Sequence, residues 1–102
     1  MLMLFYYVPE EHLSKVNAAL FELGLGHYEN YSCCAWSTKG QGQFKPLTGS
    51  QPFIGQLENT ELVDEFKVEM ICPEHLKEQA VQALLKNHPY EVPAYGFISL
   101  IL

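Results

Sequence analysis

The sequence contains no arginine. Its 102 residues include six lysines against twelve acidic residues, which leaves a formal net charge of −6. Nucleic acid binding requires a concentrated basic face, and a bidentate clamp on phosphate or carboxylate requires a guanidinium group. We therefore expect no nucleic acid partner. Charged residues make up only 18% of the chain and hydrophobic residues 48%, a composition that excludes a disordered protein.

The sequence also lacks long apolar segments and a full set of pairing cysteines. The apolar run 1–8 has no basic residue before it and leads directly into Glu10 and Glu11, so it matches neither a signal peptide nor a membrane span. We interpret it as the first strand of a cytoplasmic protein without a membrane partner. Three cysteines cannot all pair, which favours reduced thiols. Cys33 and Cys34 are expected to point to opposite faces of a strand.

A short phrase occurs twice, as Pro9-Glu10-Glu11-His12-Leu13 and as Pro73-Glu74-His75-Leu76. Each copy stands between an apolar strand-like run and a helical pattern. Proline is tolerated in the first helical turn, and glutamate is favoured there by the helix dipole. The repeat predicts a duplicated β-α-β unit within one domain, residues 1–102. Repetition by itself accounts for His12 and His75 as helix-surface residues.

The pattern between and after the helices predicts further strands. We expect one helix from Pro9 to Gly24 or Gly26 and a second from Pro73 to a stop at Pro89. A hairpin of strands 28–37 and 43–47 is expected around Lys39-Gly40-Gln41-Gly42. A polar loop, 48–59, and the alternating strand 61–72 follow, and residues 94–102 form the last strand. This order predicts an α+β ferredoxin-like sandwich with an extra hairpin strand.

The two terminal strands are apolar on both faces. In segments 2–8 and 97–102 successive residues are largely apolar, although a sheet with one wet face needs alternation. Two helices can cover only one face of the sheet. We therefore expect a second copy of the chain to cover the other face. The alternative is that these segments are simply strong strand formers with exposed aromatic side chains.

Several motifs support a family resemblance. The segment His88-Pro89-Tyr90-Glu91-Val92-Pro93 resembles a motif of the CutA divalent-cation-tolerance proteins, which have the trimeric ferredoxin-like fold of PII signalling proteins. A longer set is similar to the PII/CutA-like domain inserted in the NGG-interacting-factor-three-like family, also called YqfO-like. That set comprises Val8-Pro9-Glu10, Gly26-His27-Tyr28, Asn30-Tyr31-Ser32, Ser37-Thr38-Lys39-Gly40, Phe44, Pro46, Gly49, Pro52, Phe53-Ile54-Gly55 and His88-Pro89-Tyr90-Glu91.

The resemblance implies a homotrimer in which the sheets pack around a central axis. Full-length members of the family resemble dinuclear-metal hydrolases, but their metal ligands belong to a flanking domain. Since this sequence matches the inserted domain alone, we interpret it as a free-standing relative to which the hydrolase activity does not transfer.

The candidate site residues lie within the matched motifs. The candidate ligand-binding set is His27, Tyr31, His88, Tyr90 and Glu91. A divalent metal ion, if one is bound, would use imidazole, thiolate and carboxylate groups, and that set is His27, Cys33, His88 and Glu91. No tight ligand spacing links them, so only folding or trimerisation could assemble them. In the purely structural alternative, Glu91 bonds backbone or hydroxyl groups.

We therefore expect a non-catalytic binding or regulatory domain. It would bind a small molecule or metal ion at clefts between subunits and pass occupancy to a protein partner through loop 48–59. Two alternatives stay open, a metal-assisted hydrolase and a purely structural or interaction module. Covalent catalysis by Cys33 or Cys34 is not favoured, because both are expected in mid-strand. The acidic residues Glu58, Glu61, Asp64 and Glu65 are interpreted as a solvated strand edge.

Overall fold

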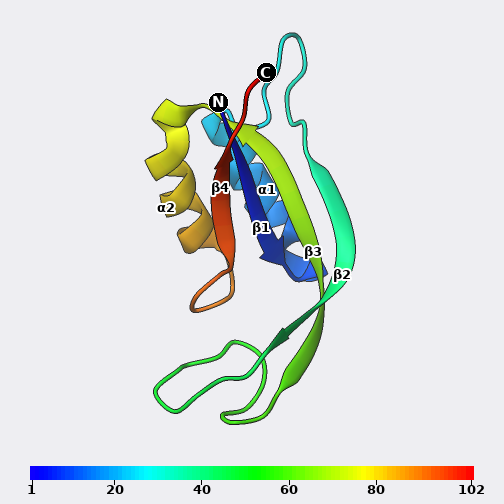
Figure 1. Ribbon diagram of the computed structural model, residues 1–102, viewed down its shortest axis with the longest axis vertical. Coiled ribbons are helices and arrows are strands. Elements are labelled where there is room, and N and C mark those ends of the chain that lie inside the picture. The colour runs from blue at the N-terminus through cyan, green and yellow to red at the C-terminus, as the bar shows by residue number, and fades with distance from the viewer.

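The computed structural model describes all residues from 1 to 102 and consists of one four-stranded antiparallel sheet with two helices on one face (Figure 1). The sheet order is β2-β3-β1-β4. The predicted ferredoxin-like α+β fold is confirmed. Its elements are β1 (Leu2–Val8), α1 (Glu10–Leu23), β2 (Trp36–Phe44), β3 (Glu61–Cys72), a short 3-10 turn (Glu74–Leu76), α2 (Lys77–Asn87) and β4 (Tyr95–Ser99).

The two copies of the repeated phrase begin equivalent helical segments. Pro9 stands immediately before α1, with Glu10 and Glu11 in the first turn. Pro73 stands before the 3-10 turn that leads into α2. Helix α1 ends at Gly24, whose φ of 108° is left-handed. Its N–H donates to the carbonyl oxygens of Leu20 and Phe21 in the last turn of the helix. The predicted duplication of the β-α unit is therefore present in three dimensions.

The core lies between the sheet and the helices. Alternate residues of β1 and β3 face the helices, and the burial of Val68, Met70 and Cys72 confirms the alternation predicted for segment 61–72. Burying each large apolar side chain contributes about 1.5–3 kcal/mol. The buried cluster contains Leu2, Leu4, Tyr6, Val8, Val16, Leu20, Leu25, Val68, Met70, Cys72, Ala80 and Leu84.

The expected hairpin around residues 39–42 is absent. Strand β2 runs without a break and pairs with β3 from Trp36 opposite Glu69 to Phe44 opposite Glu61. A tight hairpin turn needs glycine at positive φ, but Gly40 and Gly42 have none. The chain reverses instead in loop 45–60, so the sheet has four strands and no extra hairpin strand.

The expected strand over residues 28–35 is also wrong. This segment is a loop held by a single antiparallel bridge between Tyr28 and Tyr31. Cys33 has a φ of 58°, which an extended strand does not allow. Cys33 and Cys34 are therefore both exposed loop residues and do not point to opposite faces of a strand.

The sheet face opposite the helices has no cover within the chain (Figure 1). Met3, Phe5 and Tyr7 of β1 lie on this open face, and Met3 pairs with Ile71 on one side and Ile98 on the other. The Ile98 side chain is 53% exposed. The expectation of two apolar faces is therefore met in β1, whereas the last strand is shorter than predicted, because β4 ends at Ser99 and residues 100–102 lie outside it. Neither helix is both long and apolar enough to cross a membrane.

Candidate functional site

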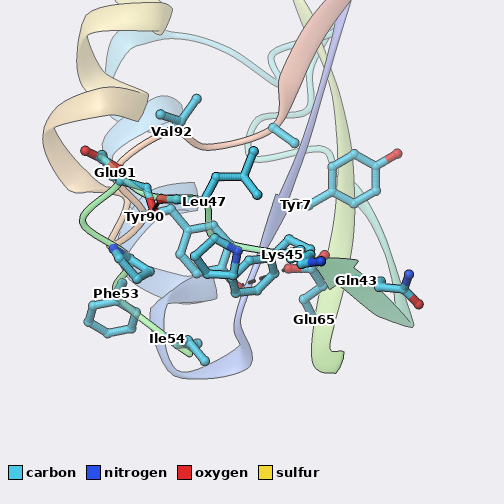
Figure 2. Close-up of a pocket in the computed structure, with 15 residues that line it drawn as sticks. Tyr7, Gln43, Lys45, Leu47, Phe53, Ile54, Glu65, Tyr90, Glu91 and Val92 are labelled. Atoms are coloured by element: carbon cyan, nitrogen blue, oxygen red, sulfur yellow. Dashed lines mark hydrogen bonds between the residues drawn. The ribbon is translucent and has the colours of Figure 1, made fainter. Parts of the chain in front are cut away.

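A pocket of about 440 Å³ opens where the ribbon formed by β2 and β3 meets the segment that leads into β4 (Figure 2). The end of β2, loop 45–60 and residues 90–94 form its walls. Most of the lining is apolar, and the charged side chains in it are Lys45, Glu65 and Glu91. The volume lies within the range typical of small-molecule sites.

Loop 45–60 is held against the segment before β4. The backbone N–H of Gln51 donates a hydrogen bond to Oε1 of Glu91 at 3.0 Å. The Phe53 ring packs between two rings, with its centroid 6.3 Å from Tyr90 and 5.7 Å from His12. His12 therefore has a packing partner that the helical repeat did not predict. The loop forms one wall of the pocket because these contacts fold it back.

His88 is a buried structural residue with both ring nitrogens occupied. Its side chain is only 6% exposed. Nε2 lies 2.6 Å from the Tyr7 carbonyl oxygen, and Nδ1 accepts a hydrogen bond from the Tyr90 N–H at 3.1 Å. A carbonyl can only accept, so the proton is on Nε2. Burial lowers the pKa of His88; the hydrogen bond to Tyr7 opposes this shift, and His12 adds a smaller lowering. A neutral His88 in this arrangement has no free lone pair for a metal ion.

His88 in turn supports Tyr90, which forms the centre of one pocket wall. The two ring centroids are 4.8 Å apart. The Tyr90 hydroxyl donates to Oε2 of Glu65 at 3.2 Å. Burial raises the pKa of Tyr90, and the nearby carboxylates of Glu65 and Glu11 raise it further. Tyr90 is therefore a neutral hydrogen-bond donor near pH 7, not a phenolate.

The other candidate residues lie at the opposite end of the molecule. His27, Tyr31 and Cys33 are exposed in the loop between α1 and β2, near the two chain termini (Figure 1). The N–H of the neighbouring Gly26 donates to the carbonyl of Ile71, which pairs with Met3 near the start of β1. His88, in contrast, contacts the carbonyl of Tyr7, four residues further along the same strand. Four residues along a strand correspond to about 13 Å.

The structure thus brings together His88, Tyr90 and Glu91 but not the remaining candidates. The four residues considered as metal ligands do not meet within one chain, and no group of three or more His, Cys, Asp or Glu residues is placed to hold a metal ion. Any metal site built from His27 and Cys33 together with Glu91 would require a second chain.

Sequence reasoning missed the residues that shape the pocket. Glu65 was assigned to a solvated edge, but it is half-buried; it pairs with Gly40 of β2, and its carboxylate lies against Gly42 on the same strand. Phe44 and Phe53 were recognised only as matched positions. The Tyr90 contact to Glu65 spans 25 residues along the chain. No local pattern predicts such a contact, because it depends on how β3 and the segment before β4 are placed on either side of β1.

Fold and comparisons together define the class, a PII-like domain of the CutA type. CutA1 from Pyrococcus horikoshii has a TM-score of 0.72 over 98% of this chain and 83% of that chain, at 20% identity, which shows the shared fold. No family model matches the sequence.

The particular relationship is homology to one segment of longer proteins. The GTP cyclohydrolase 1 type 2 homolog of Bacillus subtilis is 46% identical over 89 residues, covering 87% of this chain and 24% of that protein. The crystal structure of a Bacillus cereus protein related to NIF3 has a TM-score of 0.84 and 34% identity over 97% of this chain and 25% of that one. The chain spans about a quarter of these relatives, and the predicted resemblance is confirmed.

Proposed function

We propose that the protein is a non-catalytic, homotrimeric binding or regulatory domain whose small ligand occupies the pocket beneath loop 45–60. One observation carries this proposal. The pocket is built between a loop and a strand entry that are joined by the Gln51–Glu91 hydrogen bond and the Phe53–Tyr90 contact. A bound ligand would therefore contact both the loop and the segment before β4, and it would change the stability of the contacts between them.

The open face of the sheet supports self-association. Phe5 lies across Gly96 of the neighbouring strand, and Met3 and Ile98 extend the same apolar surface. Large exposed apolar surfaces are uncommon on monomeric proteins. A trimer formed through this face would bury it, and a trimer is what the resemblance of segment 88–93 to the CutA motif implies.

A divalent metal ion remains an alternative occupant. The exposed loop carrying His27 and Cys33 of one protomer would have to approach the Glu91 end of another. A metal-assisted hydrolase needs, in addition, an open coordination position. Elemental analysis of purified protein tests both the metal-binding domain and the metal-assisted hydrolase. A stoichiometric metal that is lost in His27→Ala would favour these alternatives, and a metal-free trimer would count against them.

Sedimentation velocity tests the assembly. The expected mass is three times the chain mass of 11.6 kDa. Phe5→Glu is expected to dissociate the trimer because it places a charge on the open face. The matched control is Gln82→Glu, which adds the same charge on the exposed side of α2 and should leave the trimer intact. A monomeric wild-type protein would contradict the proposed assembly.

Ligand binding is tested separately by a thermal-shift screen of small molecules, followed by hydrogen exchange of loop 45–60. Binding should slow exchange of the Gln51 amide, since it bonds Glu91 at the pocket wall. If no compound in the screen raises the melting temperature, the binding role fails and only the structural module is left.

A further inference from the structure

The pocket wall contains three aromatic rings in sequence. Tyr90 lies between Phe44 and Phe53, with centroid distances of 6.4 and 6.3 Å and interplanar angles of 47° in both pairs. Leu47 and Val92 extend the apolar lining beside them (Figure 2). Both are well exposed. Such a wall offers an apolar ligand a contact surface, and aromatic rings also attract cations through their electron-rich faces.

One carboxylate is fixed at this wall without a cationic partner. Glu65 accepts the Tyr90 hydroxyl on Oε2 and is half-buried. It forms no ion pair. The single ion pair of the structure joins the N-terminal amine and Glu74. A half-buried carboxylate with one neutral donor keeps unused acceptor capacity. Glu65 is therefore able to accept a charge-assisted hydrogen bond from a ligand.

The charges around the pocket disfavour an anionic ligand. Two carboxylates, Glu65 and Glu91, line it against one amine, Lys45. The chain has no arginine and carries a net charge of −6. A phosphate or carboxylate ligand would meet like charge at close range, which costs free energy in a partly desolvated site.

A neutral apolar ligand fits less well than a cation. Filling the pocket would remove water from Glu65 and give it no new partner, and desolvating an unpaired charge is unfavourable. A cation supplies that partner and can also contact the ring of Phe44 or Tyr90.

We propose that the pocket binds a hydrophobic organic ammonium ion, with its apolar part against the Phe44–Tyr90–Phe53 wall and its ammonium group on the free acceptor positions of Glu65. This assignment rests on the proposed function, since it names the ligand class for the same pocket. Tyr90 acts as a positioning residue, because its hydroxyl holds the Glu65 carboxylate toward the pocket wall.

Three probes that share a phenylethyl group and differ in charge test the assignment by calorimetry: 2-phenylethylammonium, neutral 2-phenylethanol and anionic 3-phenylpropionate. The ammonium is expected to bind about tenfold more tightly than either of the others, because it alone can form a charge-assisted hydrogen bond with the carboxylate of Glu65. Its affinity should fall as the salt concentration is raised from 0.05 to 0.5 M.

Glu65→Gln removes the charge but keeps a carbonyl acceptor for Tyr90. It should reduce ammonium affinity about tenfold and leave 2-phenylethanol binding unchanged. The matched control is Glu22→Gln, an exposed residue of α1 that lies outside both the pocket and the open face of the sheet. This control should bind the ammonium as the wild type does, and equal thermal stability of both variants would exclude unfolding as the cause.

Two results would overturn the assignment in distinguishable ways. If the alcohol or the carboxylate binds as tightly as the ammonium and Glu65→Gln changes nothing, the pocket is a ligand site but not a cation site, and the proposed function survives. If none of the three probes binds and the broad thermal-shift screen is also negative, both the cation assignment and the binding function fail.

Discussion

Replacing His88 tests the structural role assigned to the one buried histidine. His88→Ala removes the donor to the Tyr7 carbonyl and the acceptor for the Tyr90 N–H, and it leaves a cavity beneath the Tyr90 ring. Leaving a buried polar group unsatisfied costs about 1–3 kcal/mol. His88→Ala leaves two groups without partners and also a cavity, but solvent can reach part of the opened site and lowers the cost. We therefore expect a total loss of about 2–4 kcal/mol in the free energy of unfolding.

His88→Gln separates the two hydrogen bonds. The glutamine amide can still donate to the Tyr7 carbonyl, but one side chain of this length cannot also accept from the Tyr90 N–H with the same geometry. We therefore expect about half of the alanine effect, roughly 1–2 kcal/mol.

The pH dependence follows from the neutral state of His88. Burial lowers its pKa in the folded protein, so the unfolded chain takes up the proton first as the pH falls. The stability from keeping this ring neutral is fully present above the unfolded pKa near 6.5 and is lost as the pH falls below it toward the folded value. One such group contributes a slope of at most about 1.4 kcal/mol per pH unit. A positive charge on the nearby His12 favours the neutral ring, so it acts in the same direction.

Urea unfolding followed by far-UV circular dichroism at pH 7.5 and 5.5 measures both effects. Protein concentration must be held constant, because self-association would add to the apparent stability. His75→Gln is the matched control, since His75 is exposed in the 3-10 turn. If His88→Gln retains the full pH dependence of the wild type, or His88→Ala costs less than about 0.5 kcal/mol, the structural assignment of His88 is wrong.

Two further predictions concern the backbone and the core. Gly26→Ala is expected to cost about 2–4 kcal/mol, because φ is +74° and the added Cβ would lie 2.6 Å from the Cys34 carbonyl oxygen. Gly49→Ala, at φ +102° with nothing within 4 Å, should cost only about 1 kcal/mol, and equal melting temperatures for the two variants would contradict this difference. Tyr6→Phe removes the hydroxyl that donates to Asn17 and should cost about 1 kcal/mol, with a non-additive double-mutant cycle against Asn17→Ala; strict additivity would show that the pair is not coupled.

Local pattern was sufficient for the helices and for strands β1 and β3. The repeated proline and glutamate phrase predicted the start of both helical segments, and of the two predicted stops for α1, Gly24 and Gly26, the helix uses Gly24. Alternating hydrophobicity predicted the inward face of β3. These features depend on residues that are close together in the sequence, so a short stretch of sequence is enough to predict them.

Glycine was misleading where long-range pairing decided the backbone. Gly40 and Gly42 suggested a hairpin, but β3 offers pairing partners along the whole of β2, and the glycines stay extended. The same pairing carries Glu65 onto the pocket wall, although its neighbours in sequence suggest a solvated edge.

By itself, the sequence determined a duplicated ferredoxin-like domain with apolar residues on both faces of its first strand and too few basic groups for polyanions. Only the tertiary structure decided which polar residues work together. It separated His27 from His88 by the length of β1, engaged both His88 nitrogens, and placed Tyr90 against Glu65. The physical reason is that periodicity depends on neighbours along the chain, whereas a site depends on strand register and loop closure between residues far apart in it.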